Sequence, residues 1–524
     1  MIEVEVHQHL RRLLRQRRSP TGSVPPDWPH QLTMARLVAR GLRLQRHALI
    51  QVPTGDAYRL SYLLPALMWP GATLICAPTK VQAQLIYDGV PQLQSALDLR
   101  KPVLQGDRFP AGFEGVLLVE PQVWLHDRLW PVEGSDACFP RHIPVIVDRA
   151  ESLEDWAQQA LTVTLAADDW HHLEIALPHW SERLRAIRME LLARLCRRPP
   201  VQFLLHGDER VLLAEAIELA GTLEPVLPLP WARLQQQWQQ PDWVLWAEKL
   251  PSFGQFLIHL SPVRVGPILA RQLWPTQSVV TIGEALDLDK TAFAYRQRLG
   301  LPELTALKFL PDRRDRPLYL YTPTPFPAPN NPQFRDRLLS TLAQLVARTN
   351  RGPVVVLVSD RPLHGQVGTA LAAEFGSRVK VNAPYHPERG VLVCDWDYWL
   401  ANSDRGAAPV LMAIATLPFP TMEHPLVAGR VNYLKQLRQD WFRNYLLPMA
   451  ASYLQRAVGV MRGLEGVVAI LDIRAISRSY GKQLLESLAP TLSVSERDLA
   501  EHLELSRPQT APASNSSASV ETTD

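Results

Sequence analysis

The chain has few cysteines, no long apolar run and little net charge. Its 524 residues include four cysteines, at Cys76, Cys138, Cys196 and Cys394, too far apart in sequence to form a metal knuckle. Four is also a low number for a secreted disulfide scaffold, so we expect a reduced, cytoplasmic protein. The Arg-rich N-terminus lacks the apolar core of a secretory signal, and no run of about 20 apolar residues suggests a membrane span. The net charge of +3 does not by itself indicate a nucleic-acid partner.

The composition is that of a globular protein with several domains. Hydrophobic residues make up 46% and charged residues 20%, and this length allows two to four domains. Short apolar strands alternate with helices over the first 150 residues. We predict strands at Ala48–Val52, Ala72–Ala77, Gly115–Glu120 and Pro144–Asp148, and helices at Gln31–Leu44 and Leu60–Met68. This alternation is typical of a parallel sheet that helices cover on both faces.

The rest of the chain divides into an insertion and a second α/β unit. Residues 151–270 lose the strand pattern and predict long helices, Trp170–Arg197 and Asp208–Gln240, before a strand returns at Ser278–Ile282. Six tryptophans of this region are expected mainly in the core: Trp170, Trp180, Trp231, Trp238, Trp243 and Trp246. The predicted order is a basic segment (1–30), a first domain (31–150 and 271–320) with a helical insertion (151–270), a Pro-rich linker (321–332), a second domain (333–505) and a disordered tail (506–524). Strands of the second domain are expected at Val354–Ser359, Gly390–Cys394, Val410–Ala415 and Gly466–Leu471.

One segment has the layout of a phosphate-binding loop. Residues 51–65 comprise a buried strand, the turn Pro53-Thr54-Gly55 and an apolar helix, so that backbone N–H groups and a helix N-terminus could hold an anion. Such a loop ends in Gly-Lys-Ser/Thr, but this chain has Ala57-Tyr58-Arg59. The lysine that holds phosphates and the hydroxyl that binds Mg²⁺ are both replaced. Arg59 lies one residue beyond the lysine position, about 100° around the helix, so we expect its guanidinium near the metal position.

An ordered series of segments resembles the DinG/XPD type of superfamily-2 DNA helicases, from about Trp28 to Pro490. The matching stretches are Gln31 with Met34, Pro53-Thr54-Gly55, Tyr62-Leu-Leu-Pro65, Cys76-Ala-Pro-Thr-Lys80 with Gln84, Val145-Ile-Val-Asp148, Leu417-Pro-Phe-Pro420, Leu447-Pro-Met-Ala450, Gln455, Gly459, Arg462, Leu471-Asp-Ile-Arg474 and Tyr480-Gly481. No single stretch is specific, but their order and spacing are. The resemblance implies an α/β fold with two helicase-type (P-loop, RecA-like) parallel-sheet domains and a helical insertion in the first.

The resemblance also implies roles for particular residues. A nucleotide would lie against Gln31, Pro53, Thr54, Gly55, Asp148, Gln455 and Arg462, and single-stranded DNA against Lys80 and Gln84. Asp148 and Arg462 are the remnants of the catalytic set, although a strand-end aspartate such as Asp148 also commonly caps the next helix. Many family members hold an iron–sulfur cluster with four cysteines before the Asp148 segment. This chain has only Cys138 there, so we expect no iron–sulfur cluster and no other resident metal.

Further residues that the family uses for hydrolysis are replaced. The glutamate that polarises the attacking water is Arg149, which cannot accept a proton. Glu151 is expected in a surface turn, the family's Ser-Ala-Thr hinge reads Ile282-Gly283-Glu284, and the first arginine of the C-terminal motif is Val460. Such groups typically each lower the barrier by several kcal/mol. We therefore expect negligible hydrolysis, and ATP with Mg²⁺ as a ligand only if Arg59 or a partner's residue replaces the lysine.

Three functions are compatible with these residues. The favoured one is a helicase-fold protein that binds single-stranded or forked DNA, or a repair or replication protein, with lost or very weak ATP hydrolysis; association with the nucleoid would follow. The alternatives are an active ATP-dependent DNA helicase and a protein-interaction scaffold that uses the Trp-rich insertion. Arginine clusters at the N-terminus and at 313–316 are either solvated or in contact with phosphates, and no membrane partner is expected.

Overall fold

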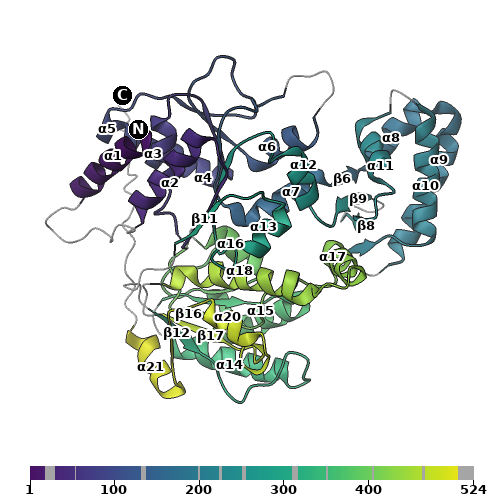
Figure 1. The fold of residues 1–524 in the computed structure, drawn as a ribbon. Helices are drawn as coiled ribbons and strands as arrows, with labels where there is room; N and C mark the ends of the chain where they lie inside the picture. The colour runs from purple at the N-terminus through teal and green to yellow at the C-terminus, as the bar shows by residue number, and fades with distance from the viewer. Residues whose placement is uncertain are drawn as a thin grey trace, which may run out of the picture. The chain divides into compact units, whose positions relative to one another are not determined.

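The computed structural model divides the chain into two compact units (Figure 1). It describes residues 1–17, 30–53, 55–131, 137–198, 201–223, 227–250, 255–309, 317–349, 352–403, 406–462 and 466–505. Thr54, the arginines at 313–316 and the predicted tail 506–524 lie outside these residues. The first unit comprises Met1–Leu310 and Pro420–Pro448, and the second Pro311–Phe419 and Met449–Asp524. The expected boundary after residue 320 is therefore displaced, and residues 420–448 return to the first unit.

A seven-stranded parallel sheet organises the first unit. Its order is β11 (Thr305–Lys308), β1 (Ala48–Val52), β10 (Val279–Glu284), β5 (Val145–Val147), β2 (Thr73–Cys76), β4 (Val116–Val119) and β3 (Val103–Gln105). All neighbouring pairs are parallel, as predicted. The central strands are mostly apolar and are buried along their whole length, because helices cover both faces of the sheet.

Alternate residues of each strand enter two separate cores. Ile50 and Ile75 point into a core with helices α1 (Ile2–Arg17), α2 (Gln31–Leu44) and α3 (Leu60–Met68), which lie together in Figure 1. Their sequence neighbours Leu49 and Leu74 point to the other face, into a core with α6 (Pro121–Leu129), α7 (Leu153–Leu161), α12 (Gly266–Gln272) and α13 (Phe293–Leu299). Because successive side chains of a strand point to opposite faces of the sheet, the core that contains α3 and the core that contains α7 lie on opposite faces.

The insertion has a sheet of its own, so the prediction of helices alone over residues 151–270 is wrong. Its antiparallel sheet has the order β6 (Val163–Leu165), β9 (Phe256–Pro262), β8 (Trp243–Lys249) and β7 (Gln202–Leu204). Helices α8 (Ala167–Ala176), α9 (Ser181–Cys196), α10 (Asp208–Ala220) and α11 (Leu229–Gln237) gather around it (Figure 1). Trp170 and Trp231 meet edge to face at 4.9 Å inside its core, whereas Trp180 is 45% exposed.

Residues 420–448 are joined to the first unit through a buried ion cluster. They contain α17 (Pro425–Gln436), from which Arg430 reaches Glu154 at the start of α7 with Nη1 and oxygen 2.7 Å apart. Arg298 lies 3.3 Å from the other oxygen of Glu154, and Arg430 also donates to the carbonyl oxygen of Val263. Burial raises the pKa of Glu154, but the attraction of Arg430 and Arg298 outweighs it and the net pKa is lowered.

The second unit is a further seven-stranded parallel sheet. Its order is β14 (Val379–Val381), β15 (Val391–Cys394), β13 (Val354–Leu357), β16 (Leu411–Ile414), β17 (Val467–Ile470), β12 (Leu318–Tyr321) and β18 (Thr491–Ser493). Its helices include α14 (Phe334–Arg348), α15 (Arg361–Phe375), α16 (Trp396–Asn402), α18 (Leu447–Val458), α20 (Gly481–Glu486) and α21 (Glu496–Leu505). Together the two units confirm the predicted α/β class with two parallel-sheet domains. Among the described residues of both units, no helix is long and apolar enough to cross a membrane.

Candidate functional site

Three adjacent strands of the first sheet bring the candidate residues to one edge. Strands β1, β10 and β5 are neighbours and run parallel, so their carboxyl ends lie side by side. Gly55 follows β1, Glu284 ends β10 and Asp148 follows β5. Ligands of open α/β sheets bind at this edge. The fold therefore places the loop and the remaining acidic residue where a phosphate-binding site would be.

The carboxylate of Asp148 is closed by groups of the chain itself. Its side chain is 0% exposed. Oδ1 accepts from the Tyr58 hydroxyl at 2.6 Å and from the backbone N–H of Arg149 at 2.8 Å. Oδ2 accepts from the Tyr62 hydroxyl at 2.8 Å and lies 3.4 Å from Nε of Arg59. Both oxygens thus have a hydroxyl donor, and the capping interpretation accounts for none of these side-chain contacts.

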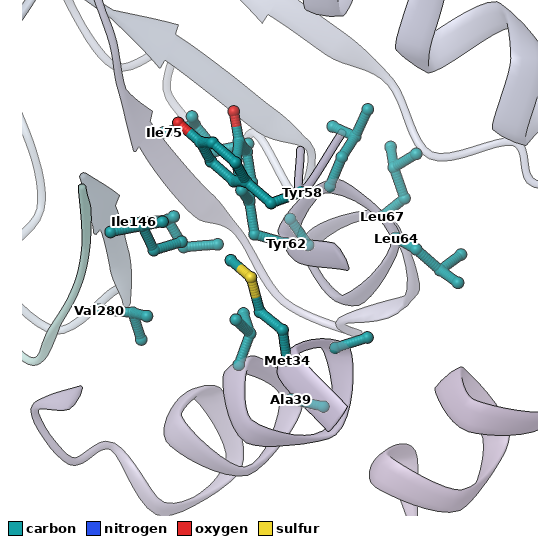
Figure 2. Packing of buried hydrophobic residues seen from close by; sticks show 14 of the residues in the cluster. Met34, Ala39, Tyr58, Tyr62, Leu64, Leu67, Ile75, Ile146 and Val280 are labelled. Carbon is teal, nitrogen blue, oxygen red and sulfur yellow. The ribbon is translucent and has the colours of Figure 1, made fainter. Parts of the chain in front are cut away.

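The two tyrosines cover Asp148 together because both point to the same side of the loop and the helix that follows it. Tyr58 and Tyr62 are four residues apart, their ring centroids are 6.3 Å apart, and both side chains are buried. Figure 2 shows both hydroxyl oxygens on the same side of the rings, away from Met34 of α2. Burial first, and then the negative charge of Asp148, raise the pKa of both phenols well above the ordinary value. Both therefore stay protonated and act as donors.

Arg59 supplies a cation beside Asp148. Its side chain is buried, and its guanidinium also donates to Oε1 of Gln84 and lies 3.7 Å from the exposed Asp56. Burial lowers the pKa of this guanidinium, but the attraction of Asp148, Tyr62 and Tyr58 outweighs burial and leaves it raised. Arg59 thus stays charged beside Asp148.

A second carboxylate faces the loop itself. Glu284 is 2% exposed and its Oε1 accepts from the backbone N–H of Gly55 at 3.2 Å. The same oxygen lies 3.8 Å from Nη1 of Arg149, and Arg149 lies 3.6 Å from Glu151. The Glu151 side chain is 1% exposed and accepts from the backbone N–H of Glu284 at 3.0 Å. The expectation that Glu151 belongs to a surface turn is therefore wrong.

These groups do not fit a magnesium triphosphate. In such a site, loop N–H groups and a lysine hold phosphate oxygens, and an acidic residue holds the metal. Here an N–H of the loop donates to Glu284, and Asp148 is bound to two phenols and a guanidinium. Each bond would have to break before a phosphate or a metal ion could take its place, and each carboxylate of the site would then repel a phosphate.

The remaining residues predicted for the first unit take up varied positions. Gln31 is buried at the start of α2 and donates from Nε2 to the carbonyl oxygen of Ala57 in the loop at 3.0 Å. Its Oε1 is buried and has no hydrogen-bond partner among the described residues. Lys80 and Gln84 lie in α4 (Thr79–Gln84) and are half-buried. Gln84, predicted to contact DNA, binds Arg59, and Pro53 is half-buried at the end of β1.

Gln455 and Arg462 of the second unit hold a loop of that unit. Gln455 donates to the carbonyl oxygen of Ser487 at 3.1 Å, and Arg462 donates to that of Leu488 at 2.7 Å and to that of Ala489 at 3.2 Å. These carbonyls follow α20. The two side chains therefore stabilise one turn of the backbone within this unit.

The Leu471-Asp-Ile-Arg474 segment has a similar supporting role. Asp472 is 0% exposed, accepts from the backbone N–H of Leu417 at 2.9 Å and pairs with Arg474 at 2.6 Å. Arg474 also lies over the ring of Phe419, which meets Tyr480 edge to face at 5.5 Å. Three family-like stretches, those that contain Leu417, Asp472 and Tyr480, thus meet around this ion pair.

Sequence reasoning missed Tyr62 and Glu284 as parts of the site. A signal for Tyr62 was present, because it lies four residues after Tyr58 and so on the same side of the helix. No comparable signal existed for Glu284, which is 229 residues from Gly55 and meets it through the strand order. Among the described residues, no group of three or more His, Cys, Asp or Glu side chains could hold a metal ion.

Sequence comparisons find similarity to helicases. A family model, Helicase C-terminal domain, matches residues 405–491. The ATP-dependent DNA helicase YoaA of Haemophilus influenzae is 26% identical over 45% of this chain and 39% of YoaA. The YoaA of Escherichia coli is 23% identical over 72% of this chain and 67% of that protein. The ATP-dependent DNA helicase DinG of Photobacterium profundum is 25% identical over 48% of this chain and 40% of DinG. The matches thus span between 39% and 67% of these relatives' lengths.

Solved structures show the same fold. An XPD helicase superposes with a TM-score of 0.59 and 12% identity, covering 90% of this chain and 100% of the other. Xpd4 of S. tokodaii gives a TM-score of 0.57 and 13% identity, covering 90% of this chain and 99% of the other. The similarity of fold therefore extends over nearly the whole chain.

Proposed function

We propose that this chain, which belongs to the DinG/XPD-type superfamily-2 helicase family, binds nucleic acid without hydrolysing ATP. The observation that carries the proposal is the closed carboxylate of Asp148, with Tyr58 and Tyr62 on its oxygens and Arg59 beside it. A hydrolytic site needs that carboxylate available for a metal ion. DNA is the proposed ligand because the chain is similar to DNA helicases, and repair or replication is the proposed context.

The substitution at Arg149 supports the same conclusion independently. Its guanidinium lies between Glu151 and Glu284, and their attraction outweighs burial so that its pKa is raised above the ordinary value. A residue held in this charged form cannot accept a proton from water. Loss of the base and closure of the metal position therefore coincide at one edge of the sheet.

The test is ATP hydrolysis by the full chain in Mg²⁺, with and without oligo(dT), beside Asp148→Asn. We expect no DNA-stimulated turnover, and any background rate should be the same in Asp148→Asn because it would come from a contaminant. DNA-stimulated hydrolysis that disappears in Asp148→Asn would overturn the proposal. A triple variant, Tyr58→Lys with Arg59→Ser and Arg149→Glu, asks whether the lost groups suffice to restore turnover.

A weaker nucleotide-binding activity is the second candidate. It is favoured by Gln31, whose buried Oε1 has no hydrogen-bond partner among the described residues and could accept from the amino group of a base. An active helicase would further require Arg59 to leave Asp148 and act in place of the lysine. Calorimetry with ATP and with ADP separates the cases: binding that Gln31→Ala abolishes supports nucleotide retention, and no binding excludes it.

A further inference from the structure

The helix pair α1 and α2, with its flanking residues, carries more net positive charge than the whole chain. Residues 1–17 and 30–46 contain eight arginines, two glutamates and no lysine or aspartate, whereas the whole chain has a net charge of only +3. Seven of these arginines have exposed side chains: Arg11, Arg12, Arg15, Arg36, Arg40, Arg43 and Arg46. The charge is therefore concentrated on one helical surface of the first unit.

Three of these arginines follow one stripe of α2 and line a hollow. Arg36, Arg40 and Arg43 are spaced by four and three residues, which places them on the same side of the helix about 6 and 4.5 Å apart along its axis. With Thr33 and with Glu3 of α1 they border a hollow of about 400 Å³. A hollow of that size between two helices can admit a phosphate and its sugar.

The charge in this hollow is largely uncompensated. Arg43 pairs with Glu3, with Nε and Oε1 2.7 Å apart. Neither Arg36 nor Arg40 has a carboxylate within 4.0 Å among the described residues. Two exposed guanidiniums in a row, next to a hydroxyl donor on Thr33, form a donor set suited to phosphate oxygens.

We propose that the α1–α2 hollow binds the phosphate backbone of nucleic acid, with Arg36 and Arg40 as the contacts and Glu3 limiting the affinity. The proposal deepens the proposed function and rests on its nucleic-acid-binding part. The contacts read no bases, so binding here is independent of sequence and weakens as salt rises. Glu3 pairs with Arg43, so that Arg43 is not available to the ligand, and it adds a negative charge at the edge of the hollow.

The experiment measures binding of labelled oligo(dT) to the full chain by fluorescence anisotropy over a range of salt concentrations. Each phosphate contact contributes about 0.7 to the slope of log K against log salt for a single strand, so Arg36→Gln with Arg40→Gln should lower the slope by about 1.4. Glu3→Gln should raise the affinity for oligo(dT), because it releases Arg43 and removes a negative charge. The matched control is Arg337→Gln with Arg348→Gln, two exposed arginines of α14, which should leave the slope unchanged.

The outcomes separate this proposal from the proposed function. A wild-type chain that binds oligo(dT) with the same slope as Arg36→Gln with Arg40→Gln would overturn the hollow as a site and leave nucleic-acid binding intact. A wild-type chain that binds no oligo(dT) at low salt would overturn both. Binding to phosphatidylglycerol vesicles that the double variant loses, with oligo(dT) binding unchanged, would show that the hollow recognises lipid phosphate and would refute the proposal.

Discussion

Replacing Tyr62 by phenylalanine tests whether Asp148 is held as a buried, ionised acceptor. The Tyr62 hydroxyl donates to Oδ2 of Asp148 at 2.8 Å, and both side chains are 0% exposed. Phenylalanine keeps the ring and its packing but leaves Oδ2 with Arg59 at 3.4 Å. Since a hydrogen bond to a charged group contributes about 1.5–3 kcal/mol, we expect the free energy of unfolding to fall by about 2 kcal/mol.

A matched control comes from Tyr295 in the same unit. Its buried hydroxyl donates to the carbonyl oxygen of Ala150, a neutral acceptor, for which the expected loss is about 0.5–1.5 kcal/mol. Both changes delete one oxygen atom, so their cavity terms are similar. The free energy of unfolding is measured in urea, with hydrogen exchange of peptides from β5 as the readout. This readout reports on the first unit alone. A loss in Tyr62→Phe that does not exceed that in Tyr295→Phe would refute the charged-acceptor reasoning.

Three further predictions concern other parts of the first unit. Burial lowers the pKa of His259 from 6.5 to about 4, so the unfolded chain gains a proton first as the pH falls. The free energy of unfolding should therefore drop by up to about 3 kcal/mol between pH 6.5 and 4. His259→Gln should flatten the curve of melting temperature against pH. Arg430→Met leaves Glu154 buried beside fewer cations and should cost about 3–5 kcal/mol in urea unfolding; Glu154→Gln in that background should recover part of the loss. Gly283→Ala places a Cβ 2.7 Å from Oε2 and 2.9 Å from the backbone nitrogen of Glu151, and should lower thermal stability by about 1–3 kcal/mol, whereas Gly365→Ala, with open space around it, should not.

The central strands of the first sheet were predictable because they are buried along their whole length, and two helices were predictable with them. The predicted bounds Ala48–Val52, Gln31–Leu44 and Leu60–Met68 agree with β1, α2 and α3. A parallel strand covered on both faces has nearly continuous apolar sequence, which stands out between polar turns. Strand β8 was missed because Trp243–Lys249 combines Leu, Ala, Glu and Lys, residues that helices also favour.

The replacement of the family's functional residues was visible in the sequence, but the contacts that the replacing residues make were not. Tyr58 and Arg149 identify themselves as replacements once the loop and the acidic strand end are aligned with the helicase series. That Glu284 would accept from Gly55 depends on β10 lying between β1 and β5, an order fixed by the whole sheet. That Gln84 would accept a hydrogen bond from Arg59 depends on the length of the Arg59 side chain and on where α3 and α4 lie in the fold. Long-range contacts of this kind follow from packing and leave no local pattern.

The return of residues 420–448 to the first unit has a consequence for synthesis. The ribosome delivers Glu154 and Arg298 well before Arg430, and strands β12 to β16 of the second unit emerge in between. Until Arg430 appears, the nascent first unit has a carboxylate destined for burial with one of its two cationic partners missing. Its folding can therefore be completed only after most of the second sheet has left the ribosome, so the two units mature together and not in sequence order.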